Sequence, residues 1–318
     1  MGKKQKALVC GSTGFIGRNM ATALADCGQY DVYGTHFKRD AIDHPGVTSI
    51  HADLTRAKDV DKAVKGMDII IQAAATTSGA GDIITRPYIH TTDNAVMNSL
   101  ILRSAYDHSV SQFLFFSCTI MYASSTEPIK ESDFSLSDPI PPHYFGAAWT
   151  KLYIEQMCEF YARLGKTRFT VMRHSNIYGP HDKYDLERSH VFGATMTKVT
   201  TNEDGILNVW GPGTEERDLL HVDDLVGFVK KAIHGQESEL EIVNVGLGKA
   251  VSIKELVEKI IAHSGKEIVM KHDLSKPHIP TKICLDIDKA KQEYDWHPQI
   301  SLDEGIKKTM QWYQENVL

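Results

Sequence analysis

The chain has 318 residues, of which 42% are hydrophobic and 24% are charged, as in ordinary globular proteins. Its length exceeds one minimal domain and suits a large domain with a smaller lobe attached. The formal net charge of −6 at pH 7 excludes nucleic acid as a bulk partner, because such a partner requires a basic surface.

Cysteine usage and hydropathy indicate a reducing compartment and no membrane. Five cysteines are scattered along the chain without the spacing of a metal site. We therefore expect free thiols, no bound metal and a cytoplasmic protein. The first apolar run, Ala7–Cys10, is too short for a signal peptide, and no window approaches the roughly 18 apolar residues that span a membrane.

Short apolar segments of β type alternate with helical segments through the first two thirds of the chain. The predicted strands are Ala7–Cys10, Asp31–Thr35, Asp68–Gln72, Gln112–Phe116 and Phe169–Arg173. The predicted helices are Phe15–Cys27, Ala57–Val64, Thr92–His108 and Ala147–Leu164. Such alternation predicts right-handed βαβ units, and therefore an α/β fold with a Rossmann-type doubly wound parallel sheet.

The remaining third is organised differently and predicts a smaller, discontinuous C-terminal lobe. Its predicted helices and short strands are Ser189–Thr200, Leu207–Trp210, Arg217–His221, Ile253–Ser264 and Leu302–Asn316. Between them, the helix Asp223–His234 and the strand Glu241–Val245 return to the earlier alternation. We therefore assign residues 1–175, with returns at about 218–246, to the sheet domain, and residues 176–217 and 247–318 to the lobe.

A glycine-rich turn follows the first predicted strand and opens a helix, with the pattern GxxGxxG. Its glycines permit a tight turn and let backbone N–H groups approach a pyrophosphate at the positive end of the helix. This placement predicts a dinucleotide-binding domain. The residues predicted to bind the dinucleotide here are Gly11, Ser12, Thr13, Gly14, Phe15, Ile16 and Gly17.

The end of the second strand distinguishes between the two nicotinamide cofactors. A fold selective for NAD carries an acidic residue there for the ribose 2′-hydroxyl, whereas a basic residue accommodates a 2′-phosphate. His36, Lys38 and Arg39 all come before the first acid, Asp40. This favours NADP over NAD, and a solvated run of charges is the alternative interpretation.

The ends of the next two strands complete the expected cofactor site. Asp53, with Leu54 beside it, follows the third strand, where its carboxylate could hydrogen-bond the adenine amino group. Ala73, Ala74 and Ala75 follow the fourth strand, and their side chains are small enough for a cofactor to lie across the sheet edge.

Further motifs follow along the chain, at Asn176–Asp182, Val209–Gly211, Arg217–Leu225, Asn244–Gly246 and Trp296–Ile306. With these motifs and the glycine turn, the chain resembles the extended short-chain dehydrogenase/reductases over nearly its whole length. Within this family it is most similar to the enzymes that epimerise and reduce GDP-linked 4-keto-6-deoxy sugars. The resemblance implies a nucleotide-sugar substrate, and a homodimer formed through the helices Thr92–His108 and Ala147–Leu164.

The resemblance also implies residues for the substrate side of the site. Arg217 would grip the diphosphate with its guanidinium fork, and a surface ion pair is the alternative interpretation. Lys282 would reach the substrate or close the lobe. The implied substrate residues are Asn176, Ser189, His190, Val191, Trp210, Arg217 and Lys282, and His174 joins the cofactor residues.

This chain departs from the catalytic pattern of the family at two positions. In the family, a tyrosine four residues before a lysine acts as acid and base, and a serine or threonine hydrogen-bonds the reacting oxygen. Lys151 matches the lysine, which binds the nicotinamide ribose, but Ala147 stands where the tyrosine belongs. Cys118, followed by Thr119, stands at the serine or threonine position, and a thiol is a weak hydrogen-bond donor.

Two explanations of Ala147 stay open: an engineered replacement in a competent enzyme, or a natural branch with changed chemistry. The simultaneous change at Cys118 favours the second. In such a branch Tyr144, two helical turns before Lys151, could bring its phenol to the site. Thr119 and His181 are the other candidate proton donors.

Epimerisation next to a ketone needs two opposed acid/base groups, and the chain matches only one. His181 stands at the family's histidine, but Ile120 stands where the epimerases carry a cysteine. The expected function is therefore an NADPH-dependent 4-keto reductase of a GDP-linked sugar, either a deoxyhexose or a heptose. The alternatives are a nucleotide-sugar 4-epimerase with tightly bound NAD, and a binding protein that has lost catalysis.

Overall fold

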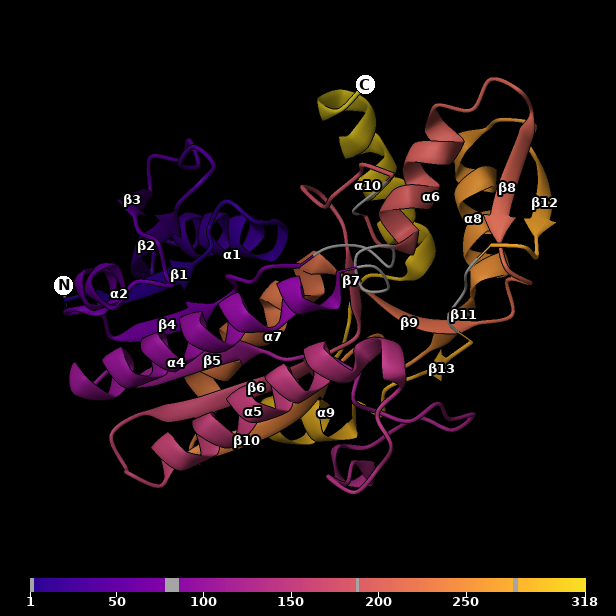
Figure 1. Ribbon diagram of the computed structural model, residues 1–318. Helices are drawn as coiled ribbons and strands as arrows, with labels where there is room; N and C mark the ends of the chain where they lie inside the picture. Colours follow the sequence, from indigo (N-terminus) through magenta and orange to yellow (C-terminus); the bar gives the residue numbers. More distant parts are fainter. Residues whose placement is uncertain (1–2, 78–85, 187–188, 277–279) are drawn as a thin grey trace.

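The computed structural model describes residues 3–77, 86–186, 189–276 and 280–318. Its larger part is a seven-stranded sheet in the order β10-β6-β5-β4-β1-β2-β3, and every neighbouring pair is parallel (Figure 1). The strands are β1 (Gln5–Cys10), β2 (Tyr30–His36), β3 (Val47–His51), β4 (Ile69–Gln72), β5 (Gln112–Phe116), β6 (Arg168–His174) and β10 (Leu240–Val245). The α/β fold predicted from the sequence is confirmed.

Helices cover both faces of this sheet, because successive residues of each buried strand point to opposite sides. Ala7 and Val9 pack with the first face, whereas Leu8 and Cys10 pack with the second. The helices on the first face are α1 (Phe15–Asp26), α7 (Val222–Gly235) and α9 (Asp288–Tyr294). Those on the second face are α2 (Ala57–Val64), α4 (Thr92–Asp107) and α5 (Phe145–Ala162).

The smaller lobe is built around β9 (Glu216–His221), which pairs with three short strands. Those strands are β7 (Asn176–Tyr178), β11 (Ala250–Ser252) and β13 (Lys282–Ile283). A second, two-stranded sheet and three helices complete the lobe, namely β8 (Ile206–Trp210), β12 (Val269–Asp273), α6 (Val191–Thr200), α8 (Ile253–Ser264) and α10 (Leu302–Asn316). The described residues also form 3-10 turns at η1 (Pro87–His90), η2 (Glu131–Asp133) and η3 (Pro142–Tyr144).

The chain crosses between the two parts more often than the predicted boundaries allow. α7 and β10 join the large sheet domain as the return predicts, but β9, within the same return, lies in the small sheet. α9 lies in a stretch assigned to the lobe, yet its Ala290 and Tyr294 are buried in the core of the large domain beside α7. The sequence around α9 is mostly polar, so these few apolar side chains did not predict that the helix packs on the large domain. In the described part of the chain, no helix is long and apolar enough to cross a membrane.

Candidate active site

The glycine turn between β1 and α1 leaves no room for side chains at two of its three glycines. Gly11 has a φ of 74°, in the left-handed region, and a Cβ there would lie 2.7 Å from the Ala74 Cα atom. A Cβ at Gly17 would lie 2.2 Å from the Gly11 carbonyl oxygen. Gly14 is the N-cap of α1 and provides no side-chain cap, so first-turn N–H groups stay available to an anion.

Hydrogen bonds to β2 hold this turn in place. The Gly11 backbone N–H donates to the Thr35 hydroxyl over 2.8 Å, and the buried Ser12 hydroxyl donates to the Thr35 carbonyl oxygen over 3.0 Å. Gly34 makes this contact possible, since a Cβ there would lie 2.6 Å from the Ser12 Oγ atom. The turn is therefore a rigid backbone cradle of the kind that binds a pyrophosphate.

The basic residues after β2 lie beside the cradle. The Arg39 guanidinium donates to the Thr13 carbonyl oxygen over 3.1 Å, and His36 Nδ1 lies 3.1 Å from the Arg39 carbonyl oxygen. His36 also packs edge-on against His51 at the end of β3. Lys38 is exposed, with its ammonium 5.9 Å from the Phe37 ring centroid. The loop after β2 thus carries two cationic side chains, Lys38 and Arg39, close to the glycine turn.

Asp53 and the three alanines flank the cradle from the neighbouring strands. The Asp53 carboxylate accepts from the Thr55 hydroxyl over 2.7 Å and pairs with Arg56, and the Thr55 hydrogen bond lowers the pKa of Asp53. Leu54 is buried. Ala73, Ala74 and Ala75 leave β4 at the sheet edge, and Ala74 packs against Gly11.

Lys151 of α5 reaches the end of β5. Its ammonium donates to the Phe116 carbonyl oxygen over 2.6 Å and lies 4.7 Å from the Phe115 ring centroid. Burial lowers the pKa of Lys151, against the opposing effects of Cys118 and Glu155. His174, at the end of the adjacent β6, bonds the Ser175 carbonyl oxygen through Nδ1, and burial lowers its pKa to about 4. His174 is therefore neutral at pH 7.

Tyr144 lies beside Cys118 although it is not on α5 itself. It ends η3 and is the N-cap of α5, and it packs with Cys118 and Ile120 around Ala148. Burial raises the pKa of Tyr144, and the nearby Arg217 guanidinium lowers it. Burial also raises the pKa of the Cys118 thiol, and Lys151 lowers it. The thiol and the phenol thus pack in one cluster near the end of β5, where the Lys151 ammonium acts electrostatically on the thiol and the Arg217 guanidinium acts on the phenol. Ala147 contributes only a methyl group.

The two other candidate proton donors lie in different surroundings. Thr119 is buried. His181 has a φ of 68°, and its ring packs edge-on against Trp312 of α10 at 4.6 Å. Burial lowers the pKa of His181, and Arg18 of α1 lowers it further. The neighbouring Asp182 has one carboxylate oxygen with no hydrogen-bond partner among the described residues, and burial raises its pKa to about 7.

Substrate residues implied by the resemblance lie on the lobe side. The Arg217 guanidinium donates to the Thr281 carbonyl oxygen over 2.6 Å, and Lys282 pairs with Glu216 over 2.6 Å. The Asn176 side chain donates to the Asp218 carbonyl oxygen over 3.4 Å. Lys282 therefore lies on the same small sheet as Arg217, with its charge already paired.

A second group of these residues surrounds α6. Ser189, His190 and Val191 lie at its N-terminal end, where the buried Ser189 hydroxyl lacks a hydrogen-bond partner within the described chain. Trp210, at the end of β8, is half exposed. Two ammonium groups lie over its ring, those of Lys198 at 5.5 Å and Lys276 at 5.9 Å from the centroid. A surface cavity of about 380 Å³ opens beside Trp210.

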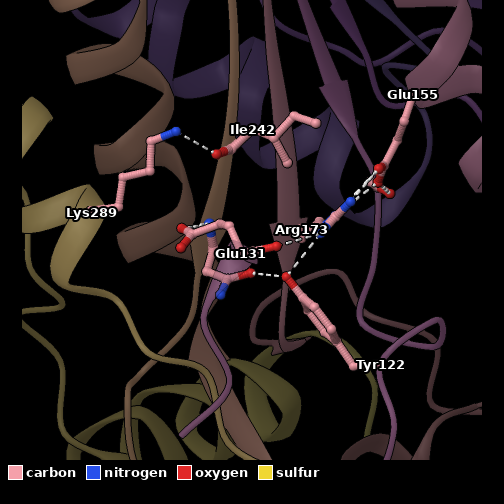
Figure 2. A network of polar contacts seen from close by, with 8 residues as sticks. Tyr122, Glu131, Glu155, Arg173, Ile242 and Lys289 are labelled. Atoms are coloured by element: carbon pink, nitrogen blue, oxygen red, sulfur yellow. Dashed lines mark hydrogen bonds and ion pairs between the residues drawn. The ribbon is translucent and has the colours of Figure 1, made fainter. Parts of the chain in front are cut away.

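A buried polar network lies directly behind the site and was not foreseen from the sequence. Figure 2 shows Arg173 between Glu155 and Tyr122. The guanidinium pairs with Glu155 over 2.7 Å, and a second nitrogen donates to the Tyr122 hydroxyl over 3.2 Å. The Tyr122 hydroxyl donates to Asn244 over 2.8 Å. The sequence did carry a signal for this network. Glu155 lies in a helix and Arg173 in a buried strand, and buried charges must be paired, so the two could have been predicted to contact each other.

Glu215 is a second residue that the sequence reasoning missed. Its side chain is 5% exposed, and neither carboxylate oxygen has a hydrogen-bond partner among the residues that the structure describes. It precedes β9 and acts electrostatically on Arg217, two residues on. A search of the same described residues finds no cluster of ligands suited to a metal ion.

Comparisons with known proteins agree with this arrangement. The model of the family described as "NAD dependent epimerase/dehydratase family" matches residues 7–246. A GDP-L-fucose synthase of Azorhizobium caulinodans is 29% identical over 98% of this chain and 97% of its own length. A putative GDP-L-fucose synthase 2 of Arabidopsis thaliana is 31% identical over 99% of this chain and 94% of its own.

A solved UDP-glucose 4-epimerase from Thermotoga maritima, with UDP-glucose, superposes with a TM-score of 0.87. It covers 99% of this chain and 100% of its own at 21% identity, which shows a shared fold. The resemblance inferred from the motifs, which is most specific towards GDP-L-fucose synthase, is thereby confirmed at the level of the family. The chain belongs to the NAD-dependent epimerase/dehydratase family, the extended short-chain dehydrogenase/reductases that act on nucleotide sugars.

Proposed function

We propose that the protein is an NADPH-dependent 4-keto reductase of a GDP-linked 4-keto sugar, a deoxyhexose or a heptose. The observation that carries this proposal is the packing of Tyr144 with Cys118 near the end of β5, within electrostatic reach of Lys151 on the thiol side and of Arg217 on the phenol side. The two relatives named as GDP-L-fucose synthases support a GDP-linked substrate.

The residues present fit a bound dinucleotide phosphate. The cradle at Gly11 and Gly17 is so close to other backbone atoms that a Cβ would fill it. Arg39, beside the Thr13 carbonyl group, is suited to a ribose 2′-phosphate, because a guanidinium binds phosphate oxygens in a bidentate manner. When bound, NADPH would supply the hydride for C4 of the sugar.

The chain's own residues orient the reactants and supply the proton. Lys151 would exchange its bond to the Phe116 carbonyl oxygen for the nicotinamide ribose. Tyr144 would donate its phenolic proton to O4 as the ketone becomes an alcohol. Arg217 would bind the diphosphate, and the Trp210 ring would offer a stacking surface to the base. In this scheme Tyr144 takes the role of the family's catalytic tyrosine, whose position in this chain is occupied by Ala147.

Epimerisation at C3 or C5 has weaker support. His181 could serve as one acid/base group, but its ring packs on Trp312. Ile120 is apolar and packs beside Tyr144 and Cys118, so it cannot act as the opposed base. We therefore expect ketoreduction with at most residual 3,5-epimerisation.

The proposal is tested by NADPH oxidation, followed at 340 nm, with GDP-4-keto-6-deoxymannose as substrate. Tyr144→Phe should lower kcat by about 10²–10⁴, the usual effect of losing a general acid, with little change in NADPH affinity. Ala147→Tyr in the Tyr144→Phe background should recover much of that activity. Tyr153→Phe, at an exposed tyrosine of α5, serves as the control for loss of a phenol.

Two other outcomes would contradict the proposal. Retention of NAD through purification, with interconversion of nucleotide sugars and no net cofactor consumption, would identify a 4-epimerase. Tight binding of NADPH without turnover, in the wild type and in Ala147→Tyr alike, would identify a binding protein.

A further inference from the structure

Two side chains of α5, one helical turn apart, hold consecutive residues of the chain as it leaves β5. The Lys151 ammonium donates to the Phe116 carbonyl oxygen over 2.6 Å, and the Ser117 hydroxyl donates to the Glu155 carboxylate over 2.5 Å. Cys118 is the next residue. The position of the thiol relative to the lysine is therefore set by a pair of contacts to one face of the helix.

Glu155 is itself held by Arg173 of β6. Both side chains are almost fully buried, and the guanidinium approaches the carboxylate at 2.7 Å and, through Nε, at 3.3 Å to each oxygen. Figure 2 shows that the far side of the guanidinium faces Tyr122. A buried, multiply bonded pair of this kind is rigid, because breaking it leaves an uncompensated charge.

The charged and titratable groups that act on Lys151 are few. They are the Cys118 thiol, the Glu155 carboxylate and the neutral His174 ring. Glu155 is the carboxylate among these groups, and it lies four residues after Lys151 on the same face of α5. The Glu155 carboxylate thus acts on the Lys151 ammonium through space, whereas Arg173 contacts the same carboxylate directly.

We propose that Glu155 and Arg173 form a positioning pair that fixes residues 116–118 against α5 and provides the counter-charge for the Lys151 ammonium. The inference rests on the proposed function, in which the Lys151 ammonium donates charge-assisted hydrogen bonds to the nicotinamide ribose. Neither residue needs to contact the substrate.

The test measures the titration of Lys151 directly, from the chemical shift of its ¹³Cε atom in protein labelled at lysine, with Lys151→Arg identifying the signal. Glu155→Gln keeps the shape of the side chain but leaves the Arg173 charge uncompensated, so the Lys151 pKa should fall by about one pH unit or more. Arg173→Gln frees the Glu155 charge, so the Lys151 pKa should rise. Glu241→Gln, which breaks a more exposed ion pair with Lys289, should leave it unchanged.

Opposite shifts in the two variants are the signature of the proposed role, since a purely structural pair would lower stability in both without opposite titrations. Equal titration of Lys151 in the wild type and both variants would overturn the inference. If one variant fails to fold, the sign of the shift in the other decides.

The same samples separate this inference from the proposed function. In Glu155→Gln, the NADPH dissociation constant should rise more at pH 9 than at pH 7, by up to about tenfold for each unit that the Lys151 pKa falls, because Lys151 loses its proton earlier. A wild type that binds no NADPH at either pH would contradict the proposed function, whereas the lysine titration would still decide the role of the pair.

Discussion

At the scale of single residues, Arg39 is the residue expected to select NADPH over NADH. Arg39→Ala should weaken NADPH binding about 10- to 100-fold and leave NADH binding unchanged, because one charge-assisted hydrogen bond contributes about 1.5–3 kcal/mol. Calorimetric titration with both cofactors measures this. Arg163→Ala, at an exposed arginine that caps the C-terminal end of α5, is the control. Equal weakening of both cofactors would mean that Arg39 shapes the glycine turn through Thr13 instead.

Asp182 gives stability an unusual dependence on pH. Its pKa is about 7 in the folded protein, compared with 3.8 in the absence of burial, so between pH 4 and 7 the folded state binds more protons than the unfolded state. The free energy of unfolding must then fall as pH rises through this window and level off above it. Relative to the wild type, Asp182→Asn should gain roughly 1–3 kcal/mol between pH 4 and pH 8.

Urea denaturation at several pH values checks this prediction. The amide introduced by Asp182→Asn keeps an oxygen that can accept the Lys183 backbone N–H, so the variant changes the charge and little else. Parallel stability curves for the two proteins from pH 4 to 8 would show that Asp182 is solvated or paired in solution.

At the scale of elements, the junction of β1 and α1 is the part least tolerant of added atoms. A Cβ in Gly17→Ala would meet the Gly11 carbonyl group, which is backbone and cannot rotate away. The variant should shift the turn, reduce NADPH affinity by at least about tenfold and lower the melting temperature. Titration calorimetry and thermal unfolding measure the two effects.

Gly28, just beyond the C-terminal end of α1, provides the matched control. Its φ is 67°, but a Cβ there would meet nothing within 4 Å. Gly28→Ala should therefore cost about 1 kcal/mol of stability through backbone strain alone and leave NADPH affinity intact. Similar loss of affinity in both variants would show that the turn binds no cofactor.

At the scale of the whole molecule, α4 and α5 present an exposed apolar face. Phe145, Trp149 and Tyr153 recur every four residues on α5, Phe160 continues the row, and Val96 of α4 is also exposed. A row of large exposed apolar side chains of this kind is typical of an interface, and the family resemblance implies that a second copy of the chain covers it.

Trp149→Glu should convert the expected homodimer into a monomer at micromolar concentration, because it places a charge in the centre of that face. Light scattering coupled to size-exclusion chromatography measures the mass. Leu274→Glu, at an exposed leucine of the other lobe, is the control. A wild type that elutes as a monomer would remove the basis for the dimer.

Features set by neighbouring residues could be predicted from the sequence. The parallel sheet follows from alternating apolar and helical segments, the cradle from three glycines after a strand, and the place of Lys151 from its motif. The helix expected at Ala147–Leu164 forms as Phe145–Ala162, a difference of two residues at each end. Each of these depends on backbone geometry or on periodicity within a short window.

Only the tertiary structure decided which distant residues meet. It packed Tyr144, from a 3-10 turn, in one cluster with Cys118 and within electrostatic reach of Arg217, and it paired Glu155 with Arg173. It also buried α9 under the large sheet, despite the polar sequence around that helix. The physical reason is the same in each case: such contacts form when separate elements pack, and the energy of burying a charge or an apolar ring depends on the partner that packing provides.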